Sequence, residues 1–220
     1  MNIKKLIRQD IAQMKEFFPK LLLMNNDGKA PLFRGELDIC DMAGEYWDTF
    51  KIKIAAPVNY PYGVPLLQEL DGKIDRIADR HISPNGFCCV AIDHILLNHA
   101  AKGLSIMEYV RQYAYPYFAN QLYFEQEGHY AAKEYKHAFD GVKQFYHESL
   151  NIRDTKSAVD ILTGIIINRL PSRNQVCLCG SNKKFKDCHL KTVEFLNRLD
   201  KKQLEEDLSN FSMSQSVTEF

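Results

Sequence analysis

The feature that most constrains this chain is a run of metal-binding residue types in the sequence CLCGSNKKFKDCH, residues 177–189. Three thiols and an imidazole, from Cys177, Cys179, Cys188 and His189, make a complete set of tetrahedral zinc ligands. A closed set of protein ligands is typical of structural zinc sites, because a catalytic zinc keeps one coordination position open. The segment is too short to bury a core of its own, so we expect Zn²⁺ to hold it together. The alternative is cysteines that are close only by coincidence.

The same stretch resembles the SEC-C motif, a small zinc module found in the Sec translocase ATPase and in many otherwise unrelated bacterial proteins. The resemblance extends over all the ligand positions, over Gly180 and Ser181, and over the lysines between the ligands. In that family the module is a docking element and not a catalyst. The resemblance therefore implies that this part of the chain docks a partner.

The composition is that of a globular protein, which we expect in the cytoplasm. Of the 220 residues 45% are hydrophobic, enough for a sizeable core. Lysine plus arginine and aspartate plus glutamate number 28 each, so no net charge favours nucleic acid or a membrane surface. We find no apolar run of membrane-spanning length and no signal peptide after Met1. In the cytoplasm the six cysteines stay reduced, as ligands, nucleophiles or core residues.

Hydrophobic periodicity predicts an α+β fold rather than alternating strand–helix units. Phe50, Ile52 and Ile54 alternate with lysines, which predicts a strand with one buried and one wet face. Ser105 and Glu108 have the spacing of a capping box at the start of a helix. The predicted strands are 32–40, 46–54 and 64–70, the predicted helices are 3–18, 104–150 (broken near Pro116 and Gly128), 157–169 and 190–208, and 71–103 is mostly irregular.

These elements divide the chain into segments of different character. Residues 1–150 form the first domain, 151–170 a connecting helix, 171–210 the zinc module with a C-terminal helix, and 211–220 a disordered tail. We find no phosphate-binding glycine loop of either nucleotide-binding type. If the protein acts on activated acyl groups, a separate protein must therefore supply the ATP-dependent activation.

Two adjacent cysteines, Cys88 and Cys89, follow a turn in the sequence HISPNGFCCV. Successive residues of an extended segment face opposite sides, so we expect one thiol in the core and the other at the surface. Free cysteine is often a buried packing residue, which is the alternative interpretation of both. A nucleophilic thiol would need a lowered pKa and oxyanion donors nearby. The nearest titratable groups are His81, His94 and His99.

The preceding sequence IAAPVNYPYGVPLLQEL resembles a motif of the ubiquitin-conjugating (UBC) enzymes, in which a strand runs into a proline-rich segment before the next strand. Pro57, Tyr60, Pro61 and Pro65 stand at the matching intervals. Further along, that family has a histidine, a turn, a glycine and the active-site cysteine, and HISPNGFCCV follows the same order. The resemblance implies a UBC-like fold over residues 1–150, with an N-terminal helix, an antiparallel β-meander and C-terminal helices.

Within this resemblance, Cys89 takes the place of the acceptor thiol and His81 that of the histidine, while Cys88 replaces a buried aliphatic residue. The loop before the cysteine is shorter than in the eukaryotic enzymes. Their oxyanion-stabilising asparagine has no direct counterpart here. Asn85 and His94 are the candidates to polarise the thioester in its place.

The resemblance implies a transferase that carries an acyl group as a cysteine thioester. Cys89 would take an activated C-terminal glycine from a separate activating enzyme and pass it to a target amine. The sequence GHYAAKEYKHAFDGVKQFY resembles bacterial relatives encoded beside activating enzymes in anti-phage defence operons. Two cargoes stay open, a ubiquitin-like modifier or the C-terminus of a cyclic-dinucleotide synthase. The alternative function is a non-catalytic UBC-fold adaptor, whereas a zinc hydrolase fits the closed ligand set poorly.

Overall fold

The computed structural model describes residues 3–25, 30–41, 43–131 and 135–216. The chain divides into two compact units, Met1–Glu134 and Tyr135–Phe220. This division lies before residue 150, where the sequence predicted the end of the first domain. Helix α5 (Ala138–Glu148) belongs to the second unit because its aromatic rings pack there. Phe139 packs on Phe211 and Phe145 on Phe195, with ring centroids 4.9 and 5.8 Å apart.

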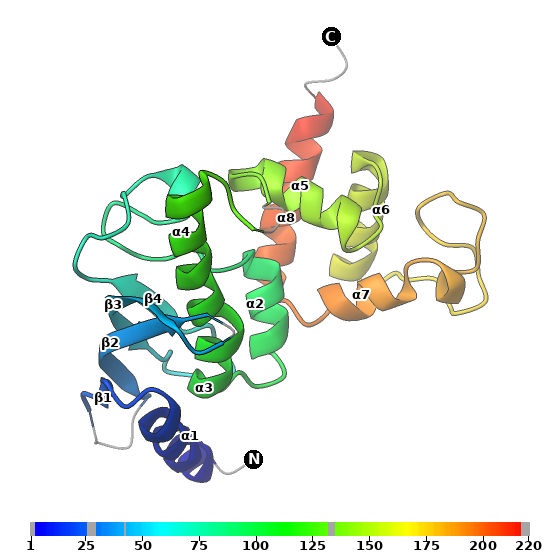
Figure 1. Ribbon diagram of the computed structural model, residues 1–220. Helices are drawn as coiled ribbons and strands as arrows, with labels where there is room; N and C mark the ends of the chain where they lie inside the picture. Colours follow the sequence, from blue (N-terminus) through cyan, green and yellow to red (C-terminus); the bar gives the residue numbers. More distant parts are fainter. Residues whose placement is uncertain (1–2, 26–29, 42, 132–134, 217–220) are drawn as a thin grey trace. The chain divides into compact units, whose positions relative to one another are not determined.

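The first unit contains a four-stranded antiparallel sheet in the order β1-β2-β3-β4 (Figure 1). In β3, Phe50, Ile52 and Ile54 are buried while Lys51 is exposed, so the predicted alternation is confirmed. Three of the strands confirm the predicted ones, whereas β1 was missed because so short a strand shows no period. The strands are β1 (Leu21–Leu23), β2 (Leu32–Cys40), β3 (Tyr46–Ala55) and β4 (Leu66–Glu69).

Helix α4 (Tyr115–Glu127) lies across one face of this sheet (Figure 1). The Phe118 ring stacks on Phe50 of β3, with centroids 4.5 Å apart. The Tyr115 hydroxyl donates to the carbonyl oxygen of Cys40 at 2.9 Å. The core of the unit therefore lies between the buried face of the sheet and α4.

A capping box starts the helical run that leads into α4. The N–H of Glu108 donates to Ser105 Oγ at 3.1 Å, and the N–H of Ser105 donates to Glu108 Oε2 at 3.0 Å, as predicted. The run consists of α3 (Ile106–Tyr109), a π-helical turn (Val110–Ala114) and α4. Gly128, with a φ of +73°, ends α4 at the predicted break.

Helix α2 (Asp93–Ala100) occupies part of the segment that the sequence predicted to be irregular. It has only eight residues, and its buried side chains include two polar ones, His94 and Asn98. A helix this short, with polar residues on its buried face, shows no clear apolar period. It begins at Asp93, shortly after the double cysteine, and so ends the loop that carries the two thiols.

A buried carboxylate joins α1 (Ile3–Phe17) to the start of α3. Asp10 accepts hydrogen bonds from the N–H groups of Ile106 and Met107, at 3.1 and 3.4 Å, and from the Tyr60 hydroxyl. Burial raises the pKa of Asp10, although these hydrogen bonds oppose the shift. The N-terminal helix is thus tied to the helical part of the unit through one side chain.

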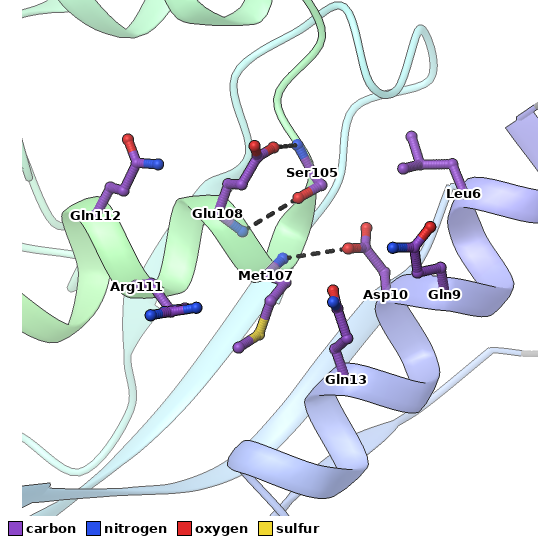
Figure 2. Close-up of a pocket in the computed structure, with 9 residues that line it drawn as sticks. All are labelled: Leu6, Gln9, Asp10, Gln13, Ser105, Met107, Glu108, Arg111 and Gln112. Carbon is purple, nitrogen blue, oxygen red and sulfur yellow. Dashed lines mark hydrogen bonds between the residues drawn. The ribbon is translucent and has the colours of Figure 1, made fainter. Parts of the chain in front are cut away.

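A polar pocket of about 560 Å³ lies between α1 and α3 (Figure 2). Gln9 and Gln13 line it from α1, and Glu108 and Arg111 line it from the facing helical segment. Among the described residues, none of those predicted to carry the thiol chemistry lines this pocket.

The second unit is helical in its described part. The single helix predicted for 190–208 is wrong, because two helices meet near Asp200, whose carboxylate accepts from the N–H of Gln203 at 2.7 Å. The second of these helices continues through residues 211–216, where the sequence predicts a tail, and residues 217–220 lie outside the described residues. Besides α5, the helices are α6 (Thr155–Ile166), α7 (Leu190–Leu196) and α8 (Lys201–Ser216). No described helix in either unit is both long and apolar enough to cross a membrane.

Candidate functional site

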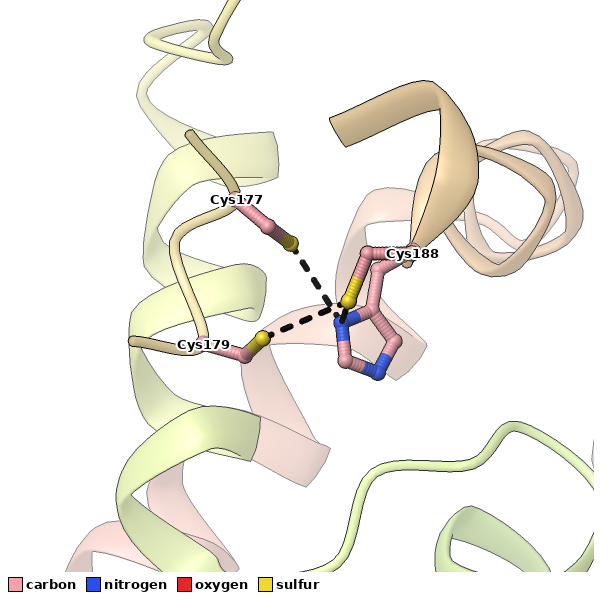
Figure 3. A group of neighbouring side chains, drawn as sticks. Cys177, Cys179 and Cys188 are labelled. Carbon is pink, nitrogen blue, oxygen red and sulfur yellow. Dashed lines mark hydrogen bonds between the residues drawn. The ribbon is translucent and has the colours of Figure 1, made fainter. Parts of the chain in front are cut away.

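The predicted metal ligands come together at one point of the second unit (Figure 3). Cys177 Sγ and Cys188 Sγ lie 3.4 and 3.3 Å from His189 Nδ1. Cys179 Sγ lies 3.5 Å from Cys188 Sγ, and all the ligand atoms are within 4.8 Å of one another. Donors at the corners of a tetrahedron, each about 2.0 to 2.3 Å from a central zinc ion, are about 3.5 to 3.8 Å apart. The spacing therefore fits one tetrahedral metal ion.

A tight loop brings the first two cysteines opposite the last two ligands. The N–H of Cys177 donates to the carbonyl oxygen of Lys183 at 2.9 Å, which closes the loop. Gly180 has a φ of +72°, a conformation that glycine adopts without strain. A 3₁₀ turn at Phe185–Asp187 then leads to His189 at the start of α7. The ligand positions thus follow from the local chain path.

A hydrogen bond outside the ligand set orients the histidine. His189 Nε2 lies 3.0 Å from the carbonyl oxygen of Asn151. A carbonyl oxygen only accepts, so Nε2 carries the proton and Nδ1 presents its lone pair to the cysteines. Metal-binding histidines usually have such a partner on the second nitrogen. His189 and Cys177 are buried, so solvent has little access to this side of the cluster.

The thiols of the cluster differ strongly in acidity. Burial raises the pKa of Cys177 to about 11. Burial also opposes ionisation of Cys179, but hydrogen bonds from Ser181 and neighbouring thiols lower its pKa to about 6. Thiolates this close repel one another unless a cation lies between them. The donor set therefore fits a divalent metal ion.

The comparison with protein families bears on this segment. The SEC-C motif matches residues 173–191. The match contains all of the ligands and the loop between them. It covers a small part of the 220-residue chain, so it identifies the SEC-C segment and not the remainder. No curated protein matches the chain.

The second candidate site is the double cysteine, in the loop between β4 and α2 of the first unit. Cys89 is exposed, whereas Cys88 is half-buried and packs against the hydrophobic core. The N–H of Cys89 donates to the carbonyl oxygen of His81 at 2.8 Å. The N–H of Cys88 donates instead to Leu67 of β4 at 3.0 Å. The two thiols thus lie in different environments, one open and one packed.

Neither thiol has the lowered pKa that is typical of catalytic cysteines. Burial raises the pKa of Cys88 to about 12, and the hydrogen bond with Tyr117 only partly offsets this. Partial desolvation of the sulfur raises the pKa of Cys89 as well, and the negative charge of Asp93 adds to the shift. In the free chain Cys89 is therefore a protonated thiol at neutral pH.

The residues predicted to assist Cys89 lie in contrasting places. His81 has a left-handed backbone, with a φ of +50°, and contacts Cys89 through its carbonyl oxygen. Asn85 lies exposed in the turn, and its carbonyl oxygen accepts from Gln68 Nε2 at 2.9 Å. His94 is 1% exposed. Their chemical roles stay predictions, and only Asn85 of the two oxyanion candidates is open to a substrate.

Sequence reasoning missed two residues that act on the double cysteine. The Tyr117 hydroxyl contacts the carbonyl oxygen of His81 at 3.3 Å and also the Cys88 thiol. No local spacing links Tyr117 to this loop, because the contact depends on how α4 packs. Asp93 could have been found from the sequence, because it lies only four residues after Cys89. A carboxylate so near a thiol disfavours the thiolate and raises the pKa of the thiol.

Proposed function

We propose that the chain is a thioester carrier of the ubiquitin-conjugating type, with a structural zinc module. Cys89 accepts an activated C-terminal glycine from a separate activating enzyme and transfers it to a target amine. The cargo is a ubiquitin-like modifier or the C-terminus of a cyclic-dinucleotide synthase. The transfer takes place in the bacterial cytoplasm and serves anti-phage defence.

The observation that carries this proposal is the division between the two thiols. Cys89 is exposed and its backbone is fixed by His81, whereas Cys88 packs inward as the resemblance implies for that position. The order of elements adds support, because a first helix, an antiparallel β-meander, the cysteine loop and further helices follow one another along the chain.

The raised pKa of Cys89 is compatible with exchange between thioesters. The sulfur of Cys89 forms a bond to the glycine carbonyl carbon, and the bond from that carbon to the activating enzyme's sulfur breaks. Cys89 releases its proton to solvent before it attacks, and the leaving thiolate takes up a proton afterwards, so the exchange consumes no net proton. Positioning of the two sulfurs then contributes more to the rate than a strong base does. We assign the oxyanion role to Asn85, which is exposed in the turn before the thiols.

The metal that suits the SEC-C segment is Zn²⁺. Cys177, Cys179, Cys188 and His189 would hold it, and a closed set of three sulfurs and one nitrogen is typical of structural zinc. Bound zinc stabilises the loop and leaves no open position for a reaction. In the proposed function this segment docks a partner, as the SEC-C resemblance implies.

A second candidate function is a non-catalytic adaptor of the same fold. It is favoured by the raised pKa of Cys89, which lacks the thiolate character typical of catalytic cysteines. Under this proposal the SEC-C segment provides the main interaction, and the exposed thiol has no role.

A thioester assay separates the two functions. The chain is incubated with the activating enzyme encoded beside it, the candidate cargo and ATP, and is analysed on a non-reducing gel. The carrier function predicts a band shift that a thiol reagent reverses, that Cys89→Ala abolishes and that Cys88→Ala retains. If the activating enzyme is loaded but no shift occurs on this chain, the adaptor function is favoured.

A further inference from the structure

Side chains of α4, and of the segment that follows α4, hold the loop before the double cysteine. The carbonyl oxygens of Asp79, Arg80 and His81 all accept side-chain hydrogen bonds. Tyr130 donates to the first at 3.2 Å, and Tyr117 to the other two at 3.1 and 3.3 Å. Three successive carbonyl groups are thus fixed before the chain reaches the thiols.

Arg80 reinforces this arrangement from inside the fold. Its Nε donates to Gln121 Oε1 at 2.8 Å, and its guanidinium lies 4.4 Å from the centre of the Phe124 ring. Gln121 Nε2 donates back to the Arg80 carbonyl oxygen at 3.1 Å. A buried guanidinium with partners on all sides keeps its backbone in place. The loop is therefore rigid at the point where Tyr117 contacts it.

The hydroxyl of Tyr117 interacts with the surroundings of both thiols. It donates to the carbonyl oxygen of His81, which in turn accepts the N–H of Cys89 at 2.8 Å. It also interacts with the Cys88 thiol, which packs against the core and lies 3.7 Å from the carbonyl oxygen of Gly86. One buried group thus supports the backbone of the open cysteine and holds the side chain of its neighbour.

We propose that Tyr117 is a positioning residue that makes Cys89, and not Cys88, the accessible thiol. The inference deepens the proposed function and rests on it for the consequence in acyl transfer. Without the hydroxyl, the His81 carbonyl oxygen loses a donor, and the Cys88 thiol keeps the Gly86 carbonyl oxygen but loses its contact with Tyr117. The loop then opens more often, and Cys88 becomes exposed in the open state.

Alkylation by iodoacetamide tests this without any activating enzyme. The full chain is treated at several pH values between 7 and 10, and peptide mass spectrometry gives a rate for each cysteine. In Tyr117→Phe we expect the Cys88 rate to rise about tenfold, since one net hydrogen bond is removed from a locally opening segment. The Cys40 rate should not change.

Tyr115→Phe is the matched control, because it removes a hydroxyl from the same helix. Tyr115 contacts the backbone of Cys40 instead, so this variant should expose Cys40 and leave Cys88 protected. An unchanged Cys88 rate in Tyr117→Phe overturns the proposal. So does an equal rise at Cys40 and Cys88, because that marks general unfolding.

A second measurement concerns acyl transfer itself. With a loaded activating enzyme, Tyr117→Phe should place part of the cargo on Cys88, whereas the parent chain places it on Cys89 alone. Cargo only on Cys89 in the variant contradicts the positioning role while leaving the carrier function intact. Absence of cargo from every variant and the parent contradicts the carrier function, and the alkylation rates then still decide the role of Tyr117.

Discussion

His189 Nε2 lies 3.0 Å from the carbonyl oxygen of Asn151, in the chain segment between α5 and α6. This contact fixes the imidazole so that Nδ1 faces the sulfurs of Cys177 and Cys188. It also ties the SEC-C segment to the helices of the second unit. The metal site and the helical part of that unit are therefore expected to be coupled.

Removal of the metal should unfold the SEC-C segment and destabilise the second unit. Elemental analysis should find about one zinc per chain, because the ligand set holds one tetrahedral ion. Cys177→Ser should lose the metal and lower the melting temperature, as a strong chelator does to the parent chain, because metal binding contributes folding free energy. Cys40→Ser, outside the cluster, is the control and should keep the metal. Full metal content in Cys177→Ser would contradict the ligand assignment.

A substitution that strains the backbone at residue 151 should weaken metal binding. Asn151 has a φ of +56°, which a β-branched residue adopts only with strain. Asn151→Val should therefore displace the carbonyl oxygen that orients His189 and reduce zinc affinity by about 10- to 100-fold, as loss of such outer partners does. Asn168→Val is matched, since Asn168 has a φ of +53° in the same unit. Competition with a zinc-binding dye measures the zinc affinity of both variants. An equal loss of affinity in the two would contradict a specific role for the Asn151 carbonyl oxygen, because general backbone strain would then explain it.

The charge of Asp93 should slow the reaction of Cys89 at neutral pH. Desolvation and this negative charge both raise the pKa of Cys89, so Asp93→Asn removes the second contribution and lowers the pKa. The thiolate fraction at pH 7.5 then rises, and alkylation of Cys89 should be about two- to fivefold faster, the range expected for one partly screened charge. Asp75→Asn, at another exposed carboxylate, is the control. A slower rate in Asp93→Asn would instead identify Asp93 as a proton acceptor.

Ionisation of Asp10 should destabilise the first unit as pH rises. Burial raises the pKa of Asp10 in the folded state above its usual value of 3.8, so the folded chain holds this proton more tightly than the unfolded chain. Its contribution to stability is present below pH 3.8 and is lost as pH increases through the folded-state pKa. The free energy of unfolding of the parent, relative to Asp10→Asn, should therefore fall as the pH is raised from about 4 through the folded-state pKa of Asp10. Urea unfolding across this range measures the difference, and a rise with pH would contradict the assignment.

Local patterns in the sequence predicted much of this structure, and contacts over long sequence distances account for most of what was missed. The metal ligands lie within residues 177–189, so their spacing alone identified the cluster. The alternation in β3 and the capping box at Ser105 are likewise local. By contrast, Asp10 meets Ile106 and Met107, far along the chain, and no pattern within α1 indicates that contact.

The thiol site shows the same limit. The alternation of the extended segment predicted that Cys88 and Cys89 face different sides, and the structure has one packed and one exposed thiol. Their acidity could not be predicted, because it depends on burial and on Tyr117 from α4. The helix after the loop was also missed, which hid Asp93 as a residue that acts on Cys89.

The central claim is tested most directly by mapping the acylated residue in the parent chain. After reaction with the activating enzyme, cargo and ATP, the chain is digested under acidic, non-reducing conditions and its peptides are analysed by mass spectrometry. The account predicts one cargo C-terminus in a thiol-labile bond to Cys89, with Cys88 unmodified. Cargo on Cys88, or no cargo on either cysteine while the activating enzyme is loaded, would contradict it.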